Sequence, residues 1–277
     1  AREQIQRGVE GRFSVDLRLD LAEALSMSPQ TLSESMTMFE RIYRENADSP
    51  LASRALYNAA FSALQIQNPK KALTLALEFI KRFPKDVLVP DIKFVAAESQ
   101  LLTNQNSAAA DTYTHLLEST RNDNIQRPIW VLRAGSALIT AERFKDVTRI
   151  LKAELENLPE LSQKAEAFLL IGQAFRKIGD NKQAVNAFEA SIAYDSNWAR
   201  ADEVLLLSGQ SRAALDDTGN ATKDWQQVIK RGENPAMVAQ AKYQLAQMAN
   251  TNQRYQEAIE FYDQVINGAS TPELLPY

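Results

Sequence analysis

The chain has 277 residues, 45% of them hydrophobic and 24% charged, which excludes a disordered chain because enough apolar surface is available for a core. Its net charge at pH 7 is −4, and the 31 basic and 35 acidic residues are interspersed, which argues against a basic stripe for nucleic acid. The lack of cysteine excludes disulfides, thiol nucleophiles and cysteine-bound metals, and the absence of any run of about 18 apolar residues argues against a membrane-spanning helix.

Helix-forming residues dominate the chain and alternating β-branched runs are scarce, so we expect an all-α fold. A spacing of 37 residues runs through it, because Ala184, Ala221 and Ala258 occupy equivalent positions. Steps of 37 or 38 residues toward the N-terminus complete this column of mostly small residues with Ser35, Ala72, Ala109 and Val147. A second small-residue column contains Ala22, Ala60, Ala97, Gly135, Gly172, Gly209 and Ala246.

Large side chains follow the first column four residues later, for example Phe188 and Trp225, with Ala76 as the exception. Two antiparallel helices approach closely only where one presents glycine or alanine and the other a large side chain. The two columns therefore predict seven helix pairs, each with an apolar face that only its neighbours can bury. Trp225 is expected in the core, and Trp130 and Trp198 are expected to pack between repeats.

In chain order, residues 1–12 are expected to end the second helix of a preceding repeat, because residues 5–8 resemble residues 229–232. The expected helix pairs are 14–27 with 31–46, 51–66 with 70–82, 88–103 with 106–121, 126–141 with 144–157, 163–178 with 181–194, 198–215 with 219–231, and 235–250 with 254–267. They divide residues 13–267 into seven repeats of one solenoid domain, at about 13–50, 51–87, 88–125, 126–162, 163–199, 200–236 and 237–267. Residues 268–277 are expected to form a tail or to start another repeat.

Within residues 165–197, large and small side chains lie at helical spacing at Phe168, Ile171, Gly172, Phe175, Ala184, Phe188 and Ser191, with Gly179-Asp180 at the turn. In these residues the stretch resembles a tetratricopeptide repeat. The family repeat has about 34 residues and this one has 37, so the added residues fall between repeats. The resemblance implies a right-handed α-solenoid, and residues 39–64 are similar to bacterial cell-envelope members of the family.

Residues that could carry chemistry are few. His115 is the only histidine, so neither a metal site nor a serine–histidine pair is supported, and no glycine-rich phosphate loop is present. The cations at positions 70, 71, 81, 82 and 85 are interpreted as a solvated helix face rather than an anion site. We therefore expect no enzyme activity, no cofactor and no metal.

The resemblance implies that the first helix of each repeat lines the concave side of the solenoid. Apolar residues there are expected to pack between neighbouring first helices, whereas polar ones could hydrogen-bond an extended peptide or a helix. The clamp with which chaperone-binding members hold a C-terminal carboxylate is disfavoured, since the positions that correspond to it are mostly Tyr, Phe, Leu and Gln, with only Asn58 and Arg133 of suitable type. The candidate partner-binding residues are Tyr57, Asn58, Phe61, Phe94, Glu98, Arg133, Ser136, Gln173, Arg176, Lys177, Gln210, Tyr243, Gln244 and Gln247.

These observations favour a non-enzymatic scaffold that binds a protein or peptide, with no nucleic-acid partner and no membrane insertion within this chain. The resemblance implies a bacterial envelope complex, in the periplasm or associated with the cell envelope, and the sequence leaves the cytoplasm open. Two alternatives remain: the scaffold portion of a polysaccharide-export or secretion machine, and the regulatory arm of an enzyme whose catalytic domain lies outside this chain. Self-association through the repeat ends is a further alternative.

Overall fold

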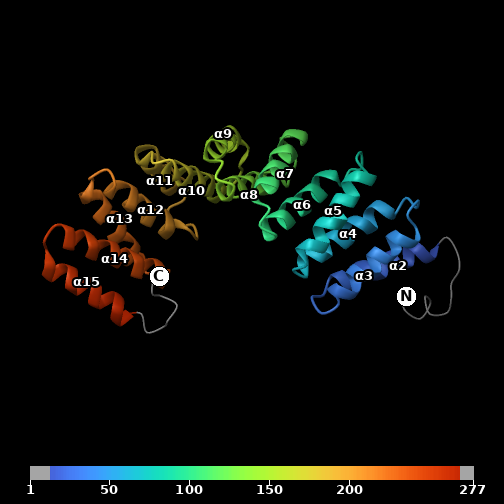
Figure 1. The fold of residues 1–277 in the computed structure, drawn as a ribbon, viewed down its shortest axis with the longest axis horizontal. Coiled ribbons are helices and arrows are strands. Elements are labelled where there is room, and N and C mark those ends of the chain that lie inside the picture. The colour runs from blue at the N-terminus through green and yellow to red at the C-terminus, as the bar shows by residue number, and fades with distance from the viewer. Residues whose placement is uncertain (1–12, 269–277) are drawn as a thin grey trace. The chain divides into compact units, whose positions relative to one another are not determined.

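The computed structural model describes residues 13–268, and the predictions for residues 1–12 and 269–277 lie outside this range. Its regular elements are fourteen α-helices and one short 3-10 helix, with no strand among the described residues (Figure 1). The all-α prediction is confirmed. The helix ends differ from the predicted ends by three residues at most, because the apolar periodicity and the capping residues that set them are local in sequence.

The helices form two compact units, unit 1 (Ala1–Ala141) and unit 2 (Glu142–Tyr277). Within each unit, helices that follow one another in the chain pack side by side. Unit 1 contains α2 (Phe13–Ser26), α3 (Leu32–Glu45), α4 (Ala52–Gln65), α5 (Pro69–Arg82), α6 (Val89–Leu102), α7 (Asn106–Ser119) and α8 (Arg127–Thr140). Unit 2 contains α9 (Phe144–Glu154), η1 (Leu155–Asn157), α10 (Leu161–Lys177), α11 (Asn181–Tyr194), α12 (Ala201–Ala213), α13 (Thr218–Arg231), α14 (Pro235–Thr251) and α15 (Tyr255–Gly268).

The turn within a helix pair has a recurrent backbone conformation. A residue with φ between 58° and 81° returns every 37 or 38 residues, at Gln67, Asn104, Glu142, Gly179, Asp216 and Gln253. In the turn around Gly179, the amide of Gly179 donates to the carbonyl of Arg176 and the amide of Asp180 donates to the carbonyl of Phe175, both at 3.0 Å. This is the Schellman pattern, which satisfies carbonyls at the helix end and needs one left-handed residue. The sequence marks that residue with glycine only at position 179.

Short polar side chains cap the second helices α5, α11 and α13. The residue directly after the left-handed one is the N-cap, and Asp180 and Asp217 each accept a hydrogen bond from a backbone amide three residues later, at 3.1 and 3.3 Å. Asn68 does the same before Pro69, which occupies the first helical position of α5. These turns reverse the chain through a residue in the left-handed conformation, and a side-chain cap follows at Asn68, Asp180 and Asp217. At the equivalent positions Gln105 and Arg143 form no such cap.

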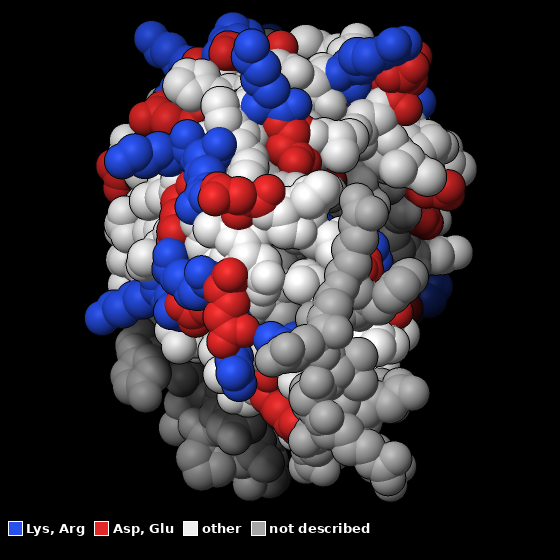
Figure 2. All heavy atoms as spheres, turned by 90° about the vertical axis from the view of Figure 1, so that its right-hand side faces the viewer, with Lys and Arg blue, Asp and Glu red and all other residues white. Residues whose placement is uncertain are grey.

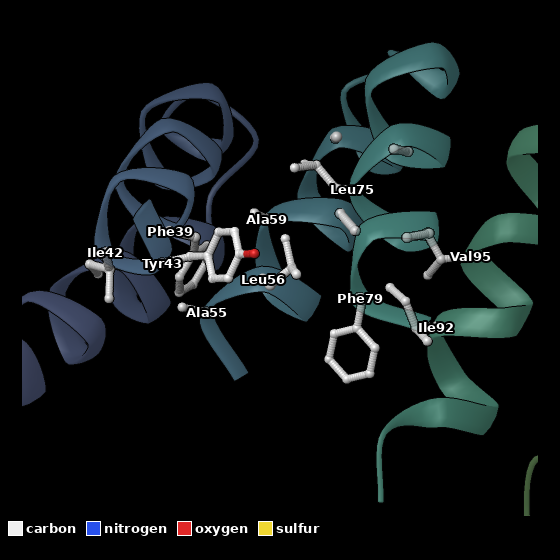
Figure 3. Close-up of a cluster of buried hydrophobic side chains, with 14 of the residues drawn as sticks. Phe39, Ile42, Tyr43, Ala55, Leu56, Ala59, Leu75, Phe79, Ile92 and Val95 are labelled. Atoms are coloured by element: carbon white, nitrogen blue, oxygen red, sulfur yellow. The ribbon is translucent and has the colours of Figure 1, made fainter. Parts of the chain in front are cut away.

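The core of unit 1 lies between α3, α4, α5 and α6. Figure 3 shows Phe39 and Tyr43 of α3 facing Leu56 of α4, while Phe79 of α5 lies beside Ile92 of α6. Alanines of α4 fill the space between these larger groups, so neighbouring helices share one continuous apolar layer. In unit 2, buried residues gather around Phe188 and around Trp225.

Two glycines allow the closest helix contacts in unit 2. A Cβ added to Gly172 of α10 would lie 2.6 and 2.9 Å from Cδ1 and Cζ of Phe188, with Cε1 closer still. A Cβ added to Gly209 of α12 would lie 2.7 Å from both Cδ1 and Cε2 of Trp225, with Nε1 closer still. Each of these glycines therefore stands where a facing aromatic ring approaches the helix backbone too closely for a Cβ.

Substitution of Gly172 or Gly209 by alanine is expected to lower the free energy of unfolding by about 1 to 3 kcal/mol, because the added methyl group overlaps a buried ring. Gly219 is the matched control: it also lies in a helix, and its added Cβ meets nothing within 4 Å. Alanine there is expected to be neutral or stabilising by up to about 1 kcal/mol. Urea unfolding followed by circular dichroism measures all three, and equal effects at the three positions would contradict the packing argument.

Candidate functional site

The candidate residues lie on α4, α6, α8, α10, α12 and α14, the first helices of their pairs. α4 contacts α6 in unit 1, and α12 contacts both α10 and α14 in unit 2, so each unit has a face made of neighbouring first helices, called here the first-helix face. All fourteen candidates are half-buried or exposed there. The apolar residues at the same positions behave as expected, since Leu132, Leu169 and Leu206 are buried in the packing between helices.

Aromatic rings form part of the first-helix face of unit 1. Tyr57 stacks on Phe61 with ring centroids 6.1 Å apart, and Phe94 meets Tyr113 of α7 edge-on at 6.2 Å. Burial raises the pKa of Tyr57, with a further contribution from the negative charge of Asp91. The rings leave an apolar surface that is only partly covered, since Phe61 is exposed.

Glu98 and Arg133, two candidates 35 residues apart in the chain, are bound to each other. Arg133 Nε lies 2.7 Å from Glu98 Oε1, its Nη2 binds the other carboxylate oxygen, and the hydroxyl of Tyr113 donates to the same carboxylate. The hydrogen bond from Arg133 to Glu98 raises the pKa of the guanidinium. This pair is therefore part of the internal structure of unit 1, and its charges are already neutralised.

Asp91 of α6 is a residue that the sequence reasoning missed. It is half-buried, and no hydrogen bond or ion pair of its carboxylate is found within residues 13–268. Burial raises its pKa above the usual range. One feature of the sequence indicates that Asp91 is unusual: the equivalent position 37 residues earlier is Arg54, which has the opposite charge. In the structure Arg54 binds Glu23 at 2.6 Å.

Asp91→Asn is expected to raise the midpoint temperature of unfolding at pH 7, and the gain is expected to disappear as the pH falls below about 4. Because the pKa is raised, the folded state favours the neutral carboxyl group of Asp91, and ionisation above that pKa lowers the free energy of unfolding. This cost is absent at a pH low enough for Asp91 to be protonated in both the folded and the unfolded state. Thermal unfolding between pH 3 and pH 8 measures the difference.

Asp146→Asn is a control for which we expect the opposite effect, a lower midpoint temperature of unfolding at pH 7. The guanidinium of Arg149, assisted by Arg143, lowers the pKa of Asp146, so its carboxylate stabilises the fold at neutral pH and loses that effect as the pH falls. A gain for Asp91→Asn that stays constant over the whole pH range would show that charge burial is not its cause.

In unit 2, three glutamines occupy equivalent positions on neighbouring helices: Gln173, Gln210 and Gln247. Gln173 Nε2 donates to Glu203 at 2.9 Å, and Gln247 Nε2 donates to the hydroxyl of Tyr243 at 2.8 Å. For the side-chain amides of Gln210 and Gln244, no hydrogen bond is found within the described part of the chain. These amides are half-buried donors and acceptors on the first-helix face.

Acidic and basic side chains are mixed on the surface of unit 1. Figure 2 shows one side of unit 1, where basic and acidic side chains lie next to one another without a large region of one sign. Ion pairs of unit 1 include Arg44 with Glu78 at 2.6 Å and Lys71 with Glu40 at 2.7 Å. This side of unit 1 therefore lacks the clustered positive charge that nucleic-acid binding needs.

The single histidine and the three tryptophans of the chain differ in their exposure. His115 is exposed on α7, and Trp130, Trp198 and Trp225 are buried. Among residues 13–268, we find no group of three or more His, Asp or Glu side chains that could hold a metal ion. None of the described helices is long and apolar enough to cross a bilayer.

Three stretches of the chain match the family described as Tetratricopeptide repeat: residues 54–86, 165–197 and 206–273. The first lies in unit 1, and the other two lie in unit 2. The chain is a tetratricopeptide repeat protein. The close contact of Gly172 with Phe188 falls within one matched repeat, and that of Gly209 with Trp225 within another.

Solved structures agree on the tetratricopeptide fold. The C-terminal part of a repeat protein from Cytophaga hutchinsonii matches with a TM-score of 0.66 at 13% identity, over 92% of this chain and 97% of that one. A tetratricopeptide repeat protein from Parabacteroides merdae matches with a TM-score of 0.60 at 12% identity, over 94% and 95% of the two chains. YrrB, described as a TPR protein with an unusual peptide-binding site, matches with 0.54 at 17% identity, over 69% and 91%. A search of curated proteins gave no match.

The last described helix of this tetratricopeptide array carries an uncovered apolar stripe. Ile259 and Ile266 of α15 are 52% and 65% exposed. Their equivalents on α11, Val185 and Ile192, pack into the core of unit 2. This stripe is a second surface that the sequence reasoning did not identify, and self-association through the repeat ends stays a prediction.

Proposed function

We propose that this tetratricopeptide repeat protein is a non-enzymatic scaffold that binds a segment of a partner protein on its first-helix faces. The observation that carries the proposal is the row of amides on α10, α12 and α14. Gln173, Gln210 and Gln247 lie at the same position of three neighbouring helices, and the amide of Gln210 has no partner among the described residues. Spaced amides suit an extended peptide, whose backbone offers a donor and an acceptor at each residue.

The aromatic residues of unit 1 complement this polar row. Tyr57, Phe61 and Phe94 offer half-buried or exposed rings on the corresponding face of that unit. Aromatic side chains supply large contact areas at low entropic cost and are enriched at protein interfaces. The peptide-binding site attributed to YrrB, a protein of the same fold, supports this use of the fold.

The partner can be tested by photo-crosslinking in the native host. A photoreactive amino acid at Gln210 is expected to capture a partner, whereas the same amino acid at Gln226, which is exposed on the second helix α13, is expected not to. Gln210→Glu combined with Gln247→Glu is expected to lose that partner in pull-downs. Identical partners at the two crosslinking positions would contradict binding on the first-helix face.

We further propose that the scaffold acts in a bacterial envelope complex. The similarity of residues 39–64 to envelope members of the family supports this. Fractionation of host cells that express the complete gene product is expected to recover it with the periplasm or the envelope. Recovery with the cytoplasm alone would contradict the proposal.

A further inference from the structure

Arg176, near the C-terminal end of α10, differs from the other arginines that the structure describes. Fourteen of the fifteen arginines between residues 13 and 268 donate hydrogen bonds or form ion pairs within the chain. For Arg176 no hydrogen bond or ion pair is found with any residue from 13 to 268, although the side chain is half-buried. Its guanidinium has five N–H donors, and partial burial removes part of the water that would satisfy them.

The neighbouring carboxylates do not supply the missing partner. Glu203 of α12 binds Gln173 and Arg200, and Glu166 of α10 binds Arg200 at 3.3 Å. Asp202 of α12 is held by Arg231 at 2.6 Å. The carboxylates of α10 and α12 therefore all bind residues other than Arg176.

Positive charge gathers at this end of α10. Lys177 follows Arg176 and is exposed, and Lys152 of α9 lies over the ring of Phe175, 5.3 Å from its centroid. Burial lowers the pKa of Arg176, as expected for a cation that is partly removed from water. The side chain stays charged at neutral pH, because the pKa of arginine in water exceeds about 12.

We propose that Arg176 binds a carboxylate of the partner segment that the first-helix face of unit 2 recognises. This inference rests on the proposed function and specifies the chemistry of the partner. The planar guanidinium can hold a carboxylate through two parallel hydrogen bonds, and Lys177 adds a second positive charge beside it. Gln173, one turn earlier on α10, starts the row of amides that continues with Gln210, so the peptide backbone next to the carboxylate would meet those amides.

A burial effect without binding is the competing explanation, because arginine stems often cover apolar surface while the charged end stays in water. The two explanations differ in their consequences. A covering role predicts that Arg176→Gln lowers stability and leaves peptide selection unchanged. A binding role predicts little change in stability and a changed peptide preference.

The test uses a display library of random twelve-residue peptides, selected on the full chain. Wild-type protein is expected to enrich peptides with Asp or Glu at one fixed position, and the Arg176→Gln variant is expected to lose that enrichment while still selecting peptides. The most enriched peptide, made synthetically with a fluorophore, is expected to bind Arg176→Gln about 10- to 100-fold more weakly by fluorescence anisotropy. Arg254→Gln is the matched control, since Arg254 already pairs with Glu257 at 2.8 Å.

Two modified forms of that peptide distinguish a side-chain carboxylate from the carboxylate of the peptide's C-terminus. If an amidated C-terminus leaves binding unchanged and Glu→Gln in the peptide abolishes it, the carboxylate is a side chain; the reverse result identifies the chain terminus. Peptides selected without any carboxylate preference, but lost with Gln210→Glu, would overturn the role of Arg176 and leave the proposed function intact. Selection of no peptide, or of peptides insensitive to Gln210→Glu, would count against both.

Discussion

Replacing Trp225 by alanine is expected to lower the free energy of unfolding of unit 2 by about 3 to 5 kcal/mol, the range for a large aromatic side chain removed from a core. Trp225 is 1% exposed, and its indole lies against the backbone of α12 at Gly209. Its Nε1 donates to the carbonyl of Leu206 at 3.2 Å, so the substitution also leaves a buried carbonyl without this donor. Urea unfolding followed by circular dichroism measures the loss.

Trp225→Phe separates the two contributions to this effect. Phenylalanine keeps most of the apolar contact with α12 and α14 but cannot donate to Leu206, so we expect a smaller loss of about 1 to 2 kcal/mol. The unfolding curve must be analysed for two transitions, because the chain has two compact units. A loss below about 1 kcal/mol for Trp225→Ala would show that unit 2 does not depend on this contact.

Replacing Arg231 by methionine is expected to cost about 3 to 5 kcal/mol, because it leaves a buried carboxylate without its cation. The side chains of Arg231 and Asp202 are 14% and 5% exposed, and Arg231 Nε lies 2.6 Å from Asp202 Oδ1. The same guanidinium donates to the carbonyl of Ser196 at 2.8 Å, which joins the end of α13 to the start of α12 and to the loop before it. The ion pair thus joins the two helices of one tetratricopeptide repeat, and the hydrogen bond to Ser196 links that repeat to the loop at the end of the preceding one.

A double-mutant cycle distinguishes the loss of the pair from the cost of an unpaired charge. Asp202→Asn in the Arg231→Met background is expected to recover part of the stability, since the uncompensated charge is gone. Arg254→Met is the surface control: its ion pair with Glu257 is exposed, and its removal is expected to change stability by no more than about 0.5 kcal/mol. Equal losses for Arg231→Met and Arg254→Met would contradict the effect of burial.

Much of the fold followed from the spacing of small and large residues. Gly172 and Phe188, or Gly209 and Trp225, are 16 residues apart, and the hairpin between them forms from neighbouring segments. Such contacts depend on helix periodicity and on the caps, both of which are local, so they could be predicted from the residues. The left-handed positions were harder to predict from the sequence, because several of them hold residues such as Gln67 and Glu142, whose side chains do not favour that conformation.

The candidate site could be predicted only in outline. The pattern correctly placed the fourteen residues on surfaces of the first helices, because helical spacing separates exposed from buried positions. It could not show that Glu98 and Arg133 neutralise each other, or that Asp91 lacks such a partner. The distances between side chains on helices about 35 residues apart depend on how those helices pack.

The sequence by itself determined that this chain is a tetratricopeptide array, where its helices begin and end, and which residues form its core. These properties follow from periodic hydrophobicity and from glycine or alanine opposite large side chains, which each repeat carries within its own residues. Only the tertiary structure decided which charged and polar groups remain available to a partner. Arg200 binds Glu203 and Glu166, and Arg231 binds Asp202, whereas Arg176 has no partner among residues 13–268. The residues alone could not show this, because ion pairing depends on distances of a few ångströms between separate helices.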